Sequence, residues 1–288
     1  MEDKKRLFQD KSNGFKVLIY IFLLLIFTLI GALVTLLIGI GGVSSIKLGQ
    51  AISSTLMFVV PPALLYLLAY PRPMRSLGFN PIRKPWILLA GLAVMLVSLP
   101  LINLLTQWNE GIRLPSSLAP IEQALQALEE QAQAITEQML NTNTVGGLIS
   151  NLIVIALIPA IGEEMTFRGT IQQFLIKGCR NAHVGIILGA ILFSAFHFQF
   201  YGFFPRLLLG IFLGYFFYIT KSLWVSILMH FLNNGSAVVV YYLHNKGIIE
   251  ADMEHFGSTS NIAILVASGI LCIALLIIAW KRREKSVS

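Results

Sequence analysis

The chain has 288 residues, of which 56% are hydrophobic and only 12% are charged. Soluble domains carry about 25% charged residues, so this composition excludes an ordinary soluble globular protein. The net charge of +7 does not indicate nucleic acid as a partner, because the Lys and Arg residues fall in short segments between apolar runs. We therefore expect a multi-pass membrane protein whose surroundings are the lipid bilayer.

Apolar runs of about 20 residues, the length of a membrane-spanning helix, recur along the chain. The first run, from about Val17 to Ile40, is longer than a signal-peptide core and lacks a small-residue cleavage site, so we expect a retained helix. The pattern predicts an all-α, polytopic transmembrane helical bundle of about eight spans. Their approximate ranges are 17–40, 51–70, 86–107, 146–161, 183–200, 206–220, 222–243 and 261–280.

Basic residues mark every second connection between these spans. They precede the first span, follow the second, fourth and sixth, and form the tail after the last, from Lys281 to Lys285. Two of the opposite connections carry acids, over 110–137 and 250–254. The positive-inside rule then predicts that both termini are cytoplasmic.

One segment outside the spans, about 117–140, has the period of an amphipathic helix. Apolar residues recur at intervals of four and three against a face of Glu and Gln; they are Ile121, Leu125, Leu128, Ala132, Ile135 and Met139. We expect an extracytoplasmic helix that rests on the bundle at the membrane interface, and a lid or a docking surface is the alternative.

Two adjacent acids follow the fourth apolar run, in the string PAIGEEMTFRG. A carboxylate in hydrocarbon is costly, so such residues usually face a bundle interior or a water-filled cavity. Glu164 and Arg168 are four residues apart, which places them on one helical face as an ion pair. Glu163 points about a quarter-turn away and is left for another partner. A salt bridge at the membrane edge is the simpler alternative for this motif.

Further polar residues lie within the fifth and seventh predicted spans. His197 is near the end of the fifth, and His230 is in the seventh, with Asn234 one turn later on the same face. A single intramembrane histidine is often a packing residue. Two histidines, one asparagine and two glutamates on three spans are harder to explain as independent packing choices, so we predict one shared site.

Other hydrolytic sites are excluded by the residues that are missing. The sequence has no H-E-x-x-H zinc motif and no G-x-S-x-G nucleophile elbow. Its three aspartates, Asp3, Asp10 and Asp252, lie outside the apolar runs, which excludes a membrane aspartyl dyad. Ser194 and Ser226 are within spans, where a single serine usually bonds to backbone carbonyls.

The three motifs, taken together, resemble the CPBP intramembrane proteases, also called the CAAX protease and bacteriocin-processing (Abi) family. The family has three motifs, E-E-x-x-x-R, F-x-x-x-H and H-x-x-x-N. In this sequence the first resembles Glu163, Glu164 and Arg168, the second Phe193 and His197, and the third His230 and Asn234. The resemblance covers about residues 148–242. It divides the chain into 1–145, with three spans and the amphipathic helix, a catalytic core over 146–245, and 246–288, with a loop, the final span and the basic tail.

This resemblance implies hydrolysis of a peptide bond within the membrane. Glu163 and His197 would hold and deprotonate a water, and His230 and Asn234 would stabilise the oxyanion. Glu164, Arg168 and Phe193 would support them, with Glu164 and Arg168 orienting Glu163. We favour a metal-free site, although Glu163, His197 and His230 form a known type of zinc ligand set.

The expected partner is a peptide or protein substrate in or at the membrane, with or without a lipid anchor. Two other functions stay open: a non-catalytic protein for peptide binding or bacteriocin self-immunity, and a proton-coupled transporter, for which the sequence lacks the usual repeat symmetry. A bacterial plasma membrane fits the chain, which has no organellar retention signal.

Overall fold

The computed structural model describes residues 5–38, 41–250 and 256–283. These residues form helices and connections without a strand, which confirms the predicted all-α class. Some sequence predictions lie outside the described residues, namely those for residues 1–4, for most of the acidic segment 250–254, for His255 and for the tail beyond Arg283.

Six helical stretches in the described residues are long and apolar enough to cross a membrane. They are Asn13–Ile38 (α1), Val43–Ala69, Val145–Cys179, Phe203–Thr220 (α12), Leu223–Asn245 (α13) and Ile262–Lys281 (α14). A seventh forms if α5 (Pro85–Val97) and α6 (Leu99–Glu110), which are bent by 44°, make one span. The chain is therefore a polytopic membrane protein.

The span predicted at 183–200 is shorter than expected. Its helix, α11 (Ala182–Ala195), has 14 residues, and the chain then turns through Phe196–Gly202 before α12 begins. Phe198 in this turn has a positive φ of 53°, a conformation incompatible with a continuing helix. The polar residue of interest on this segment, His197, therefore lies in a loop within the bundle.

Two of the long stretches are made of several shorter helical segments. Val43–Ala69 consists of α2 (Val43–Ser54), the π-helical η1 (Thr55–Val59) and α3 (Val60–Ala69). Val145–Cys179 consists of α8 (Val145–Asn151), η3 (Leu152–Leu157), α9 (Ile158–Thr166), η4 (Phe167–Gln172) and α10 (Gln173–Cys179), in which η3 and η4 are π-helical. Such π-helical turns often occur at functional sites.

Prolines explain how the first of these stretches docks on the second. Pro62 has no N–H and cannot pair with the carbonyl of Phe58 four residues earlier. That carbonyl instead accepts a hydrogen bond of 2.9 Å from the Thr166 hydroxyl of α9. Nearby, the Tyr66 hydroxyl donates to the Gly169 carbonyl over 2.7 Å. Polar groups freed from helix pairing thus fix the α1–α3 unit to the helix that carries the acids.

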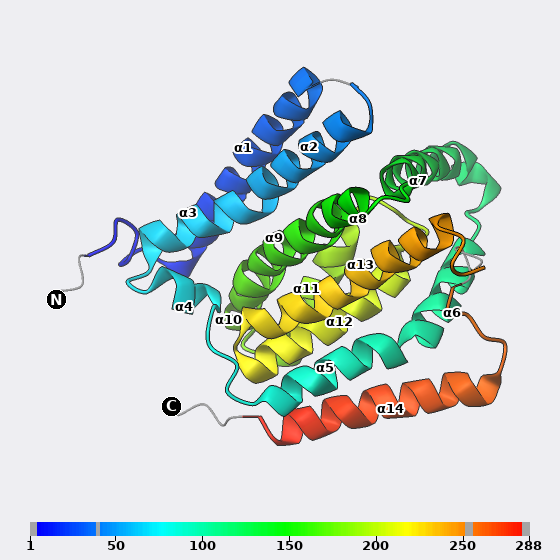
Figure 1. The fold of residues 1–288 in the computed structure, drawn as a ribbon. Helices are drawn as coiled ribbons and strands as arrows, with labels where there is room; N and C mark the ends of the chain where they lie inside the picture. Colours follow the sequence, from blue (N-terminus) through cyan, green and yellow to red (C-terminus); the bar gives the residue numbers. More distant parts are fainter. Residues whose placement is uncertain (1–4, 39–40, 251–255, 284–288) are drawn as a thin grey trace.

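Figure 1 shows the arrangement of the bundle. The α1–α3 unit lies on one flank, α5 and α14 lie on the other, and α8 to α13 fill the space between. One apolar cluster joins α5, α12, α13 and α14. A second joins α1, α3, α9, the end of α12 and the start of α13. The polar site lies between these two clusters.

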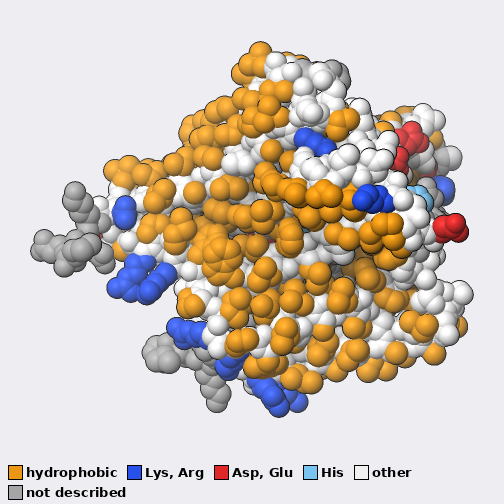
Figure 2. All heavy atoms as spheres, viewed as in Figure 1, with side chains coloured by type: hydrophobic (Ala, Val, Ile, Leu, Met, Phe, Trp, Pro, Cys, Tyr) orange, Lys and Arg blue, Asp and Glu red, His pale blue; other side chains and the backbone are white. Residues whose placement is uncertain are grey.

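The remaining segments cap the two ends of the bundle. α4 (Pro73–Leu77) lies near the end that holds both termini, whereas α7 (Ala119–Leu140), preceded by the short η2 (Ser116–Leu118), lies at the opposite end. Most of the Lys and Arg side chains visible in Figure 2 lie around the first end, and a few lie toward the second, where the visible acidic side chains are. Apolar side chains cover the surface between them, as expected for a bilayer-facing belt.

The helix predicted at about 117–140 is present as α7, and one edge of its apolar stripe contacts the protein: Leu125 and Ala132 are half-buried and Met139 is buried. Ile121, Leu128 and Ile135 are exposed. The half-buried positions include Glu122 and Glu129, which face the loop between α11 and α12. The exposed edge of the stripe suits a helix at the membrane interface, while the acidic side contacts the protein.

Candidate active site

The two acids of the E-E-x-x-x-R motif lie in the last turns of α9, next to the π-helical η4. The predicted ion pair is present: Arg168 Nη1 donates to Glu164 Oε1 over 2.7 Å, and both side chains are fully buried. The same oxygen of Glu164 lies 3.0 Å from His230 Nδ1 on α13. Glu164 therefore also orients His230, and its role in orienting Glu163, which the resemblance implied, stays a prediction.

Arg168 joins three segments of the core. Its second terminal nitrogen donates to the Gly210 carbonyl of α12 over 3.2 Å. Its guanidinium lies over the Phe193 ring of α11, 4.3 Å from the ring centroid, in a cation–π contact. Phe193 also contacts the imidazoles of His197 and His230 edge to face, with centroids 5.2 and 5.9 Å away. Phe193 thus packs beneath both histidines.

Hydrogen bonds at Nδ1 set the orientation and the tautomer of both histidines. His197 Nδ1 lies 2.9 Å from the Phe193 carbonyl, and His230 Nδ1 lies 3.0 Å from the carboxylate of Glu164. A carbonyl and an ionised carboxylate only accept hydrogen bonds, so we assign the Nδ1 atoms as donors. In each neutral ring Nε2 is then the basic nitrogen.

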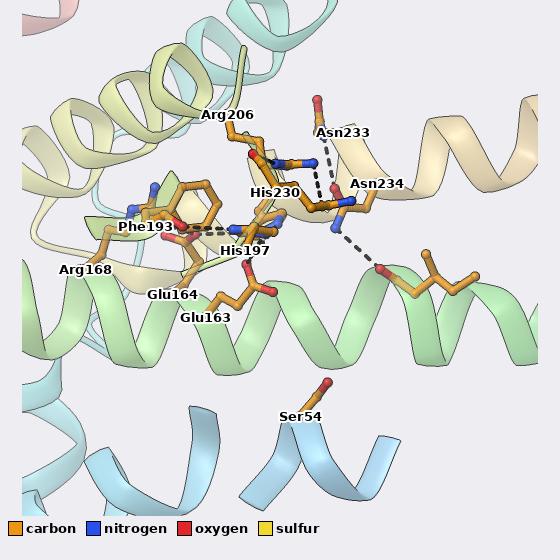
Figure 3. A network of polar contacts seen from close by, with 12 residues as sticks. Ser54, Glu163, Glu164, Arg168, Phe193, His197, Arg206, His230, Asn233 and Asn234 are labelled. Atoms are coloured by element: carbon orange, nitrogen blue, oxygen red, sulfur yellow. Dashed lines mark hydrogen bonds and ion pairs between the residues drawn. The ribbon is translucent and has the colours of Figure 1, made fainter. Parts of the chain in front are cut away.

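The Nε2 atoms of both histidines point toward one oxygen of Glu163. Oε2 of Glu163 lies 4.0 Å from His197 Nε2 and 3.9 Å from His230 Nε2 (Figure 3). This oxygen is buried and has no hydrogen-bond partner among the described residues. The side chains of His197 and Glu163 are 28% and 13% exposed, against 3% for His230, so the site is open on the side of His197.

Asn234 lies one helical turn after His230 and contacts the start of the acid-bearing helix. Pro159 has no N–H for the carbonyl of Ile155, four residues earlier. Asn234 Nδ2 donates to this carbonyl over 3.4 Å, and Asn234 Oδ1 accepts from Asn233 over 3.0 Å. The side-chain nitrogen Nδ2 of Asn234 carries two hydrogens, and one of them is used in the bond to the Ile155 carbonyl. The second N–H is left for another acceptor.

Sequence reasoning missed a group of residues around the loop that carries His197. Arg206, in the first turn of α12, donates to the backbone and side-chain oxygens of Gln199, over 3.3 and 2.6 Å. It also lies 3.9 Å from Glu129 on α7, and its charge interacts with Glu163. The signal was present in the sequence, since Arg206 is a charged residue at the edge of an apolar span.

The other polar candidates lie outside the site. His183 bonds the Tyr215 hydroxyl over 2.7 Å, and His244 is exposed at the end of α13. The hydroxyls of Ser194 and Ser226 donate to the carbonyls of Phe203 and Leu223, as expected for serines that bond to the backbone. All residues of the three motifs, by contrast, meet between α9, α11 and α13.

The predicted zinc ligands, Glu163, His197 and His230, have the right donor atoms but a wide spacing. Among the described residues no group of three His, Cys, Asp or Glu side chains has metal-holding geometry. Zinc–ligand bonds of about 2.0–2.1 Å place two tetrahedral ligands about 3.3 Å apart. The separations of 3.9 and 4.0 Å exceed this value, so zinc binding would require the three side chains to move inward.

The segment that contains this site matches a known protein family. Residues 145–236 match the family model described as type II CAAX prenyl endopeptidase Rce1-like. Over this segment, which is less than half of the chain, the protein is similar to the Rce1-like family. The match includes every residue of the three motifs and ends within α13, so α1–α7 and α14 lie outside it. The chain matches no curated protein and no solved structure.

The similarity of residues 145–236 to the Rce1-like family indicates the class of activity. The family consists of CAAX intramembrane proteases, which makes a membrane-embedded peptide hydrolase the coarse description of this chain. A protease of this family acts on peptide or protein substrates.

Proposed function

We propose that the chain is an intramembrane endopeptidase that cleaves a peptide bond in a membrane-associated or lipidated substrate, with Glu163 as the general base. The observation that carries the proposal is the convergence of His197 Nε2 and His230 Nε2 on Glu163 Oε2, at 4.0 and 3.9 Å. A polar gap of this size suits a bridging water better than direct contact.

The two sides of the site have different roles in the proposed reaction, since one activates the water and the other stabilises the oxyanion. On the open side, Glu163 and His197 hold the water, and Glu163 takes its proton as the oxygen attacks the substrate carbonyl. Glu163 then gives this proton to the leaving amine as the peptide C–N bond breaks. On the closed side, His230 stabilises the oxyanion as an imidazolium, because Nδ1 already donates to Glu164 and only a protonated ring also donates from Nε2. The unused N–H of Asn234 is the second donor.

The roles of the supporting residues follow from their contacts. Arg168 balances the charge of Glu164, and Glu164 in turn fixes the ring of His230. Phe193 supports both imidazoles from below and excludes water from the Arg168 side. The site then operates without a metal, and the alternative is zinc held by Glu163, His197 and His230.

We place the protein in a bacterial plasma membrane with both termini in the cytoplasm. The basic connections and the basic tail support this orientation. The loop with His197 then lies nearer to the extracytoplasmic side, because α11 begins at the basic end of the bundle and α7 contacts that loop at the other.

The decisive experiment compares wild type, Glu163→Gln and a matched control, Glu130→Gln, in detergent micelles. Each protein is incubated with peptides derived from a membrane proteome, and new termini are detected by mass spectrometry. We expect Glu163→Gln to abolish cleavage and Glu130→Gln, an exposed residue of α7, to keep it. Cleavage by Glu163→Gln at the wild-type rate would refute the general-base role.

The same assay tests the metal. We expect wild-type cleavage to persist in a strong zinc chelator such as 1,10-phenanthroline. Loss of cleavage that is restored by added zinc would replace the metal-free mechanism with the zinc alternative.

A further inference from the structure

A pocket of about 270 Å³ lies at the basic end of the molecule, away from the proposed active site. Three segments that are far apart in the sequence form its walls: α4 with the connection after it, α10, and the end of α12 with the turn that follows. Its volume is below the ~300–1,000 Å³ of pockets for drug-sized molecules, so it suits a small charged group.

Hydrogen bonds hold the three walls together. Gln173 on α10 donates to the carbonyls of Ser76 and Leu77, each over 3.2 Å. Asn80 donates to the Lys221 carbonyl over 2.8 Å, and the hydroxyl of Ser222 donates to the Asn80 carbonyl over 2.6 Å. The pocket is therefore preorganised, and its backbone and amide groups are largely paired.

Three cationic side chains line this pocket, one from each wall: Arg75, Lys177 and Lys221. Lys221 lies over the Tyr218 ring at 3.6 Å. Within the described residues none of the three head groups forms a hydrogen bond or an ion pair with a carboxylate. The pocket thus combines fixed walls with unneutralised positive charge, whereas basic residues that only obey the positive-inside rule need no shared pocket.

Two of the walls also contribute apolar side chains. Ile176 and Phe217 face the same space as the three cations. A ligand that carries a phosphate and continues into hydrocarbon matches such a mixed lining, and basic pockets between membrane helices are known to bind anionic lipid head groups. Arg and Lys provide the charge-assisted hydrogen bonds that phosphate oxygens accept.

We propose that Arg75, Lys177 and Lys221 form a phosphate-binding site at the membrane interface, which holds either the head group of an anionic phospholipid or a free phosphate. The proposal is independent of the protease mechanism, because it rests on a pocket that contains no residue of the three motifs.

The titration of Lys221 gives the site a pH signature. Partial burial, and secondarily the charge of Arg283, lowers the pKa of Lys221 to about 8. The other charged groups around it, Arg75 and Lys177, are also cationic, so a bound phosphate favours the protonated form of Lys221. Affinity for the phosphate should fall as the pH rises from 7 to 9.

The test uses the full chain, delipidated in a neutral detergent, and measures binding by native mass spectrometry and thermal shift. The probes are phosphatidylglycerol, phosphatidylcholine and inorganic phosphate. The pocket variant is Arg75→Gln/Lys177→Gln. The matched control, Lys11→Gln/Lys281→Gln, removes two charges from the same end of the molecule outside the pocket.

We expect phosphatidylglycerol to bind the pocket variant at least about tenfold more weakly than wild type, and the control to bind like wild type. Retention of phosphatidylglycerol against millimolar inorganic phosphate identifies the lipid as the source, and a thermal shift with inorganic phosphate alone identifies the free anion. Equal losses in the pocket variant and the control, or equal binding of phosphatidylcholine, would overturn the proposal.

Discussion

Arg168 is a buried cation whose contacts involve three helices of the site. Its guanidinium balances Glu164, and replacement by methionine would leave that carboxylate buried without a countercharge. Breaking a buried ion pair by removing one partner costs about 3–5 kcal/mol. We expect Arg168→Met to lower the free energy of unfolding by about this amount, measured by chemical denaturation in detergent.

The matched control for this prediction is Arg72→Met, at an exposed arginine before α4. It should leave the free energy of unfolding within about 0.5 kcal/mol of wild type. Arg168→Lys should be intermediate, because a lysine keeps the charge but not the planar contact with Phe193. An Arg168→Met protein as stable as wild type would show that the pair contributes nothing to folding.

At the residue scale, the local part of the site followed from the sequence and the long-range part did not. The spacing of Glu164 and Arg168 predicts their ion pair, because residues four apart share a helical face. The 3.0 Å contact of Glu164 with His230 depends on how α9 crosses α13, which no local spacing determines. The sequence therefore predicted the contact of Glu164 with Arg168 but not its contact with His230.

The helix α7 illustrates how an element outside the three motifs acts on the site. Glu129 Oε2 accepts the Tyr201 N–H over 3.2 Å, and Glu129 Oε1 lies 3.9 Å from Arg206. Tyr201 and Arg206 flank the loop that positions His197. We expect Glu129→Ala to lower kcat of the proposed cleavage about tenfold with little change in KM, because small displacements of a catalytic group are costly.

Two further variants separate positioning from folding. Glu129→Gln should keep more activity than Glu129→Ala, because its amide oxygen still accepts from Tyr201. Glu130→Ala, at the adjacent exposed residue, should behave like wild type. Hydrogen exchange at the Tyr201 amide should accelerate in Glu129→Ala alone. Unchanged exchange and unchanged kcat would remove α7 from the mechanism.

Gly162, immediately before Glu163, controls the approach of the α1–α3 unit to α9. A Cβ at this position would lie 2.9 Å from Phe58 Cβ and 3.2 Å from a methyl group of Val59. Gly162→Ala should therefore destabilise the protein by about 1–3 kcal/mol through overpacking. Gly178→Ala in α10, where nothing lies within 4 Å, is the control and should not lower the melting temperature.

At the element scale, periodicity predicted that α7 is a helix but not how much of its apolar stripe contacts the protein. The apolar stripe suggested a face against the bundle, and one edge of it, with Leu125 and Met139, is half-buried or buried. The other edge, with Ile121 and Leu128, is exposed, and Glu122 and Glu129 contact the loop beside the buried edge. In water an exposed stripe of this kind would be unfavourable, whereas at a membrane interface lipid covers it. A periodic pattern alone does not specify whether an apolar stripe faces the protein bundle or the lipid.

At the scale of the whole molecule, hydropathy was sufficient for the class and for most spans, because lipid imposes a length on each crossing. It overextended α11, since the three phenylalanines within Phe196–Phe200 do not distinguish a helix from a turn inside the bundle. The orientation rests on charge alone, and the distribution in Figure 2 agrees with one basic and one acidic end.

The native cysteines allow this orientation to be tested directly. Cys179 is exposed at the basic end of the bundle, and Cys272 is buried. In inside-out vesicles a membrane-impermeant maleimide should label the wild-type protein at Cys179, and in right-side-out vesicles it should not. The variant Cys179→Ser/Glu130→Cys, which moves the exposed thiol to α7, should show the opposite pattern. Labelling of both proteins from the same side would contradict the predicted topology, and labelling of both from the wrong sides would invert it.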